Sequence, residues 1–146
     1  MIRLSAYHYR IAKTSHLAMG SLGEQVVKEQ LEANGAIVRY SAKGEHMGDL
    51  TVLNSSTGEL ISIEVKTAKL SKDRKYRFTL RKDGSQDCSG VDYVVLLVVL
   101  KTGFAVPYVI PGERLEGKRQ ACITSHPDTY SGQYSSFKCS IESILH

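Results

Sequence analysis

The stretch Ile-Ser-Ile-Glu-Val-Lys at residues 61–66 alternates apolar and polar side chains, as a β-strand with one buried face does. Residues two apart on a strand share a face, so Glu64 and Lys66 should point together to one side. The two isoleucines and Val65 should point to the other side, into the core. The strand therefore presents a metal-binding oxygen beside an ammonium group, an arrangement that can hold Mg²⁺ next to a phosphodiester.

The residues around this strand predict an α/β fold. Ser21 is a candidate N-cap with Glu24 three residues later, and Asn34-Gly35 is typical of a helix end, which predicts a helix over residues 21–34. Residues 91–100 are nearly continuous in apolar side chains, as a central strand is. We expect a mixed sheet of about five strands, flanked by helices and with irregular cover behind. The other expected strands are 36–40, 49–53, 59–67, 76–81, 104–110 and 119–124, with helical turns at 111–116 and 141–145.

Length and composition favour one domain over residues 1–146. Within it we distinguish a basic N-terminal arm (1–20), a core (21–110) and a C-terminal extension (111–146). Apolar runs stay far below the ~20 residues that a membrane span needs, and the first residues lack the apolar region of a signal peptide. Three widely spaced cysteines suit a reducing compartment, so we expect a cytoplasmic protein without a membrane partner.

The basic residues are concentrated in two segments, although the net charge is only +4. Residues 1–20 contain three basic residues and no acid, residues 69–82 contain seven against one aspartate, and the remainder is acidic overall. A basic patch on an otherwise acidic protein indicates a polyanionic partner, most simply nucleic acid, while a solvated surface is the alternative. The candidate phosphate contacts are Arg3, Arg10, Lys13, Lys69, Lys72, Arg74, Lys75, Arg77, Arg81 and Lys82.

Two further carboxylates are expected to lie near Glu64. Asp49 begins a strand that the short turn at 54–58 pairs with the Glu64 strand, so their polar faces can meet. Glu24 falls within about 20° of Leu31 on a helical projection, which places it beside the core-facing stripe. Two alternatives remain open from the residues alone: Glu24 as part of a capping box on Ser21, and Glu64 with its neighbouring lysine as an inert ion pair.

These residues together resemble the PD-(D/E)XK nuclease superfamily. The resemblance rests on Gly23-Glu24, on Gly48-Asp49-Leu50 and on the run from 63 to 68, Ile-Glu-Val-Lys-Thr-Ala. The spacings between the acidic residues are similar to those of archaeal Holliday-junction resolvases. Residues 65–68 followed by 76–81 are similar to small nucleases that include cyanobacterial intron homing enzymes. The match covers roughly residues 20–110, and the two ends of the chain find no counterpart in it.

The resemblance implies a restriction-endonuclease-like core and a Mg²⁺-dependent DNA endonuclease, with Mn²⁺ able to substitute. Asp49, Glu64 and the Val65 carbonyl would hold the ion. Lys66 would orient the attacking water, and Glu24 would reach the ion through water or help hold a second one. The implied catalytic set is therefore Glu24, Asp49, Glu64 and Lys66. The similarity to the resolvases implies a branched-DNA substrate. A sequence-specific restriction-type or homing enzyme is the alternative, and a non-catalytic nucleic-acid-binding module is the alternative of another class.

The strand expected at 104–110 bears on assembly. Pro107 predicts an edge strand or a bulge, because proline cannot donate a ladder hydrogen bond. Phe104, Val106, Tyr108 and Ile110 would then lie on an edge that a monomer has to protect. One copy of the site cuts one strand, so cutting both strands needs two copies. We therefore expect a homodimer or a dimer of dimers.

Overall fold

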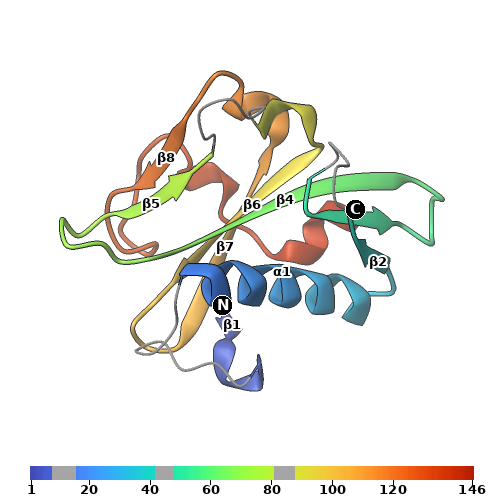
Figure 1. The fold of residues 1–146 in the computed structure, drawn as a ribbon, viewed down its shortest axis with the longest axis horizontal. Helices are drawn as coiled ribbons and strands as arrows, with labels where there is room; N and C mark the ends of the chain where they lie inside the picture. Colours follow the sequence, from blue (N-terminus) through green and yellow to red (C-terminus); the bar gives the residue numbers. More distant parts are fainter. Residues whose placement is uncertain (8–15, 42–47, 81–87) are drawn as a thin grey trace.

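The computed structural model describes residues 1–7, 16–41, 48–80 and 88–146. A six-stranded sheet runs through the middle of the molecule in the order β1-β7-β6-β4-β3-β2, and β5 and β8 form a second sheet at one end (Figure 1). The predicted α/β class is confirmed, with six strands in the main sheet in place of about five. The strands are β1 (Ile2–Arg3), β2 (Ile37–Tyr40), β3 (Leu50–Leu53), β4 (Leu60–Lys69), β5 (Tyr76–Thr79), β6 (Tyr93–Val99), β7 (Phe104–Pro111) and β8 (Gln120–Ile123).

The centre of the main sheet is the parallel pair formed by β4 and β6. Ile63 lies opposite Tyr93 at one end of this pair, and Lys69 lies opposite Val99 at the other. The remaining neighbours in the sheet are antiparallel, so the sheet is mixed, as expected. Residues 94–99 of β6 are buried throughout, because both faces of this strand are covered by other layers.

The helix α1 (His16–Ala33) covers one face of the main sheet (Figure 1). The prediction that it starts at Ser21 is wrong: Ser21 lies inside the helix, so no capping box forms there. The helix extends in the N-terminal direction because Met19 is buried and prolongs the apolar stripe by one turn. Its end is as predicted, since Ala36 N–H donates to the Leu31 carbonyl and Gly35 N–H donates to Glu32, in a Schellman motif.

The opposite face of the sheet is covered by the β5–β8 sheet, by residues 88–91 and by the segment 112–137 that contains β8. Tyr76, Phe78, Tyr130 and Tyr134 pack there against buried side chains of β6 and β7. The irregular cover expected from the sequence is therefore present on this face. It includes the 3₁₀ turns η3 (Cys88–Gly90), η4 (Gly112–Leu115) and η5 (Ser135–Phe137), whereas η1 (Leu4–Tyr7) follows β1 and η6 (Ile141–Leu145) packs beside α1.

The outer side of β7 is only partly paired, so the edge position that Pro107 predicted is met in part: β1 lies outside β7 in the sheet, and Tyr108 forms an isolated bridge with Lys138. β1 pairs only with Phe104 and Ala105, and beyond them the Pro107 carbonyl accepts a hydrogen bond from Cys139 N–H. The expectation that the side chains of β7 need protection by a second subunit is wrong, however. Val106, Tyr108 and Ile110 are buried by the chain itself, under the layer that contains the residue 130–134 segment.

The described parts of the chain contain one α-helix, α1, whereas the sequence predicted a sheet flanked by more than one helix. The short strand β1 was not predicted, because two residues are too few to show an alternating pattern. Within the described residues, no helix combines the length and the apolar character needed to cross a membrane.

Candidate active site

The strand β4 brings Glu64 and Lys66 to the sheet face opposite α1. Both side chains are half-buried, while Ile63 and Val65 on the other face are buried in the core, as the alternation predicted. Lys66 Nζ lies 3.4 Å from Glu64 Oε1, with 29% and 23% of the two side chains exposed. The ion pair is therefore accessible to solvent from one side and held by a rigid strand from the other.

Asp49 directly precedes β3, at the point where the pairing of β3 with β4 ends and β4 continues beside β6 only. β3 pairs with β4 as far as Leu50 opposite Ile63, and Asp49 N–H then donates to the Ile63 carbonyl over 2.8 Å. Asp49 Oδ2 accepts a hydrogen bond from Val65 N–H, also over 2.8 Å. The carboxylate thus takes the place of the next ladder partner, and this fixes it beside Glu64.

Gly48 makes the approach of Asp49 to β4 possible. Its φ is 79°, a left-handed value that glycine adopts without strain. A Cβ atom at this position would lie 2.6 Å from the Ile63 carbonyl oxygen and 2.9 Å from the Ile63 carbonyl carbon, both of them backbone atoms. The sequence order Gly-Asp is therefore a steric requirement at this site.

The helix α1 contributes Glu24 through a close helix–strand contact. A Cβ atom on Gly23 would lie 1.9 Å from Thr67 Oγ1, so glycine lets the helix pack directly on β4. Glu24, the next residue, is half-buried and hydrogen-bonded to Asp49. Because Ser21 is inside the helix, the capping alternative for Glu24 is excluded, and Glu24 faces the other two carboxylates.

Glu24, Asp49 and Glu64 form a cluster of negative charge. Burial raises the pKa of Glu24 to about 7, and the charge and hydrogen bond of Asp49 add to the rise, with a smaller contribution from Glu64. Burial and then the charge of Asp49 also raise the pKa of Glu64, while Lys66 opposes the rise. Such a cluster favours the binding of a proton or of a cation that can replace it.

The donor atoms of this cluster fit a hard divalent cation in kind. Carboxylate and carbonyl oxygens are the ligands that Mg²⁺ prefers, and the Val65 carbonyl points to the same side of β4 as its N–H, towards Asp49. As the side chains stand, no three His, Cys, Asp or Glu residues in the described ranges converge closely enough to enclose an ion. An ion would therefore compete with Lys66 for Glu64 and with Val65 N–H for Asp49.

Two residues that the sequence reasoning missed fasten β4 next to the site. Asp92 Oδ2 accepts hydrogen bonds from Ser62 N–H (2.8 Å) and Ser62 Oγ (3.1 Å), and Ser62 Oγ accepts one from Asp92 N–H (3.0 Å). Ser62 lies two residues before Glu64 on the same face of β4. The pair spans 30 positions in the sequence, and no local pattern marks it.

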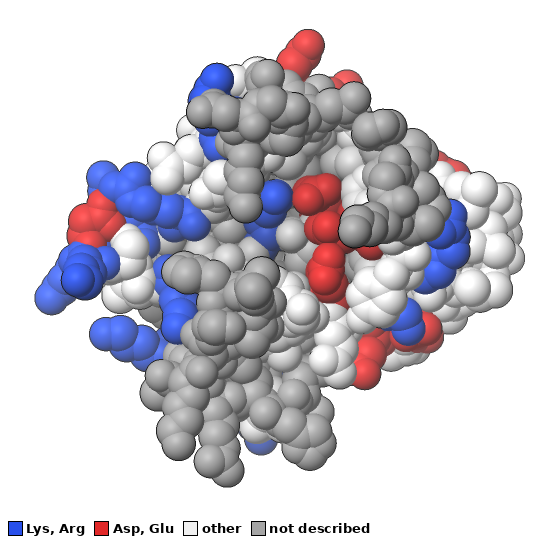
Figure 2. Space-filling view, viewed as in Figure 1, with Lys and Arg blue, Asp and Glu red and all other residues white. Residues whose placement is uncertain are grey.

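The predicted basic residues are only partly brought together. Lys69, Lys72, Arg74, Lys75 and Arg77 lie on the end of β4, the turn after it and the start of β5, whereas Arg3 lies on β1, across β6 and β7 from β4. In Figure 2, acidic side chains gather near the middle of one face, and Lys and Arg side chains gather beside them at the end where β5 and β8 lie. Arg10, Lys13, Arg81 and Lys82 fall outside the described residues.

The pairing of β5 with β8 brings two more basic residues to this cluster. Lys118 and Arg119 directly precede β8, and the Arg119 carbonyl accepts a hydrogen bond from Leu80 N–H. Charge alone could have suggested them, but their location depends on a pairing between segments about 40 residues apart in the sequence.

Comparison with known proteins supports the fold. No protein-family model matches the sequence, and a search of curated proteins gives no significant match. Among solved structures, the chain is similar to the bacterial homing endonuclease I-Ssp6803I, with a TM-score of 0.70 and 18% sequence identity over 90% of this chain and 91% of that one. The chain therefore has the fold of this endonuclease. The similarity covers a larger share of the chain than residues 20–110, so it includes residues outside the range that the sequence resemblance matched.

Proposed function

We propose that this protein is a Mg²⁺-dependent endonuclease of the PD-(D/E)XK type that hydrolyses phosphodiester bonds in DNA. The observation that carries the proposal is the convergence of Glu24, Asp49 and Glu64, from three different elements, beside Lys66. The shared fold with a homing endonuclease supports it, and so does the basic surface next to the cluster.

In this proposal Asp49, Glu64 and the Val65 carbonyl hold the ion. When bound, the ion supplies Lewis-acid stabilisation of the negative charge that develops on the phosphate. Lys66 orients the attacking water and offsets part of the same charge from the neighbouring position on β4. Glu24 would contact the ion through a bound water molecule or help to hold a second ion. Lys66 would be released for these roles when Glu64 turns from it to the ion.

We further propose a sequence-specific duplex substrate, in place of the branched DNA that the similarity to the resolvases implied. The likeness to a homing endonuclease covers about nine-tenths of both chains and so includes much of the structure outside the catalytic core. Specificity in a small nuclease has to come from such additional surface, because the metal and the lysine contact only the phosphate, which carries no sequence information.

Two copies would be needed to cut both strands, and we propose a homodimer. In the described residues, Ile37 and Leu60 are 62% and 67% exposed, and Leu53 lies between them in register across β2, β3 and β4. This apolar stripe is on the same sheet face as Glu64. A second copy seated there would direct both active sites to one side of the assembly, towards a single DNA molecule.

Cleavage assays with site variants test the catalytic proposal. Asp49→Asn, Glu64→Gln and Lys66→Ala should abolish cleavage of plasmid and linear DNA in Mg²⁺ while DNA binding is retained. Glu59→Gln, which removes an exposed carboxylate just before β4, is the control and should cleave like the wild type. Wild-type rates in the three site variants would refute the assignment. A protein that binds DNA equally in EDTA and cuts no DNA in Mg²⁺ would be the non-catalytic binding module instead.

The dimer has a separate test in the mass measured by light scattering. Leu60→Asp should convert a dimer into a monomer, because a carboxylate in the apolar stripe cannot be buried against a second copy without a large desolvation cost. A wild-type monomer at micromolar concentration, both free and with DNA, would contradict the proposed assembly.

A further inference from the structure

The two-stranded sheet of β5 and β8 has one face in the core and one face in solvent. Side chains alternate between the faces in both strands, and the register places buried residues opposite buried ones. The buried face packs on the main sheet and fixes the ribbon to the body of the protein. It consists of Tyr76, Phe78, Ala121 and Ile123.

The outward face carries side chains that the core does not use. Arg77 lies opposite Cys122 and Thr79 lies opposite Gln120, and Arg77, Thr79 and Gln120 are all exposed. Arginine can form two parallel hydrogen bonds to guanine in the major groove, and glutamine can do the same with adenine. Threonine offers a hydroxyl and a methyl group, which can contact either a base edge or a thymine methyl.

Arg77 is held in place before any ligand binds. Its Nη2 donates to Asp73 Oδ2, and its Nη1 lies 3.8 Å from Cys122 Sγ across the strand pair. Arg77 and Ser71 together lower the pKa of Asp73 to about 2, so the aspartate is ionised under all ordinary conditions. The Arg77 side chain is nevertheless 41% exposed, so it is accessible to a ligand from solvent. Such pre-organisation lowers the entropy cost of binding.

The turn before β5 places positive charge next to this face. Ser71 N–H donates to the Lys75 carbonyl (2.9 Å), and Ser71 Oγ accepts a hydrogen bond from Lys75 N–H (3.3 Å). Lys72 and Arg74 are exposed within this closed turn. From Lys66 to the end of the hairpin arm at residue 70, β4 advances about 13 Å, or roughly four base-pair steps of DNA. The turn can therefore contact DNA phosphates roughly four base pairs from the phosphodiester bond that the active site would cut.

We propose that the outward face of the β5–β8 ribbon enters the major groove and determines the sequence preference of the nuclease, with Arg77 reading a guanine and Gln120 an adenine. A two-stranded ribbon fits the width of this groove. The two outward pairs are separated by about 7 Å along the strands, which corresponds to about two base-pair steps, so the bases they read should be about two steps apart. The inference rests on the proposed endonuclease function and adds its specificity-determining residues.

Selection from a duplex library with a randomised sequence tests this inference. Wild type, Arg77→Lys and Gln120→Ala are each allowed to cleave the library in Mg²⁺ at fixed salt, and the cut products are sequenced. Arg77→Lys keeps the charge but loses the planar fork, so preference for guanine at one position should fall roughly 5- to 150-fold. Gln120→Ala should relax an adenine position about two steps away to a similar extent.

Two further variants separate base reading from general electrostatics. Lys72→Ala should weaken binding to all sequences alike and leave the sequence preference unchanged. Asp73→Asn releases Arg77 while it removes a negative charge, so it should weaken the guanine preference without weakening overall binding. Thermal melting of each variant confirms that the ribbon remains folded, as expected for exposed positions.

Binding of the same library by each protein in EDTA distinguishes a failure of base reading from a failure of the endonuclease function. If the wild type cuts no DNA yet enriches sequences whose preferred bases are lost in Arg77→Lys and Gln120→Ala, base reading stands and the endonuclease function fails. If the wild type cuts but both variants keep its sequence profile, or if the wild type cuts all sequences equally, the ribbon does not read bases. Absence of both cutting and enrichment would overturn both proposals.

Discussion

Replacing Gly48 by alanine is expected to damage both stability and catalysis, and Gly58→Ala provides a matched comparison. Both glycines have left-handed φ values, 79° and 76°, and both lie on the chain that forms the β3–β4 hairpin. The two positions differ in their surroundings. A Cβ on Gly48 would lie 2.6 Å from the Ile63 carbonyl oxygen, whereas a Cβ on Gly58 would have no atom within 4 Å.

The expected free energies follow from this difference. Holding alanine in the left-handed region costs about 1–2 kcal/mol at either position. Gly48→Ala carries an additional cost, because the atoms it meets belong to the backbone of a central strand and cannot rotate away. Overpacking of this kind costs about 1–3 kcal/mol, so we expect a total of about 2–5 kcal/mol for Gly48→Ala. The backbone movement that relieves the contact with Ile63 should also displace Asp49 and break its hydrogen bonds to Ile63 and Val65.

Urea denaturation and thermal melting of the two variants measure this difference. At roughly 2–4 °C per kcal/mol for a chain of this size, Gly48→Ala should melt clearly below Gly58→Ala. The cleavage rate should fall in Gly48→Ala and remain close to wild type in Gly58→Ala, measured at a temperature where both are folded. Equal destabilisation of the two variants would refute the argument that the close approach to β4 requires glycine at position 48.

Three further predictions concern electrostatics and strand attachment. Because Glu24 has its pKa raised to about 7, the folded protein holds a proton that the unfolded chain has released, so stability in EDTA should fall as pH rises from about 4.5 to 7. Glu24→Gln should remove this loss and gain about 1–2 kcal/mol at pH 8, after allowance for solvent screening of a half-buried group. Replacing Lys72, Arg74 and Lys75 by alanine should flatten the dependence of log K for DNA on log salt by roughly two to three. Asp92→Ala should leave the Ser62 N–H without its partner, lowering stability by about 1–2 kcal/mol and slowing cleavage.

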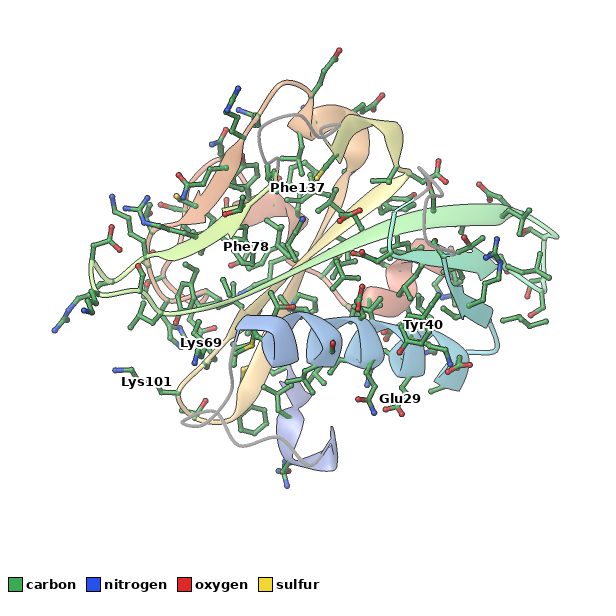
Figure 3. All side chains as sticks on the ribbon, in the orientation of Figure 1. Glu29, Tyr40, Lys69, Phe78, Lys101 and Phe137 are labelled. Carbon is green, nitrogen blue, oxygen red and sulfur yellow. The ribbon has the colours of Figure 1, made fainter. Side chains whose placement is uncertain are left out.

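Each of these predictions has a control in the same chain. Glu29 also lies on α1, but its side chain points away from the sheet into solvent, so Glu29→Gln should leave the pH profile unchanged (Figure 3). Lys28 is the control for the salt experiment, because α1 covers the face of the main sheet opposite the β5–β8 sheet and Lys28 is paired there with Glu32. A salt slope that is unchanged by the triple replacement would place the DNA contact on another surface. An unchanged stability of Asp92→Ala would show that solvent replaces its hydrogen bonds.

The sequence by itself determined the features that depend on neighbouring residues. The alternation in residues 61–66 predicted that Glu64 and Lys66 share a face, because side chains of a strand alternate whatever the strand pairs with. The helix end at Asn34-Gly35 was likewise predicted, since it follows from the conformational preferences of single residues. Pro107 predicted only in part the place of β7, which has β1 outside it in the sheet.

The tertiary structure alone decided which segments meet. It extended α1 to residues before Ser21 and thereby decided between the two alternatives for Glu24, a cap on Ser21 or a neighbour of Asp49, because packing of Met19 outweighs a local capping preference. It buried Tyr108 under the chain's own C-terminal part, and it paired β5 with β8 to create an outward face that no window of sequence contains. Periodicity records which side of an element is apolar, but the partner that covers that side is chosen by packing over the whole chain.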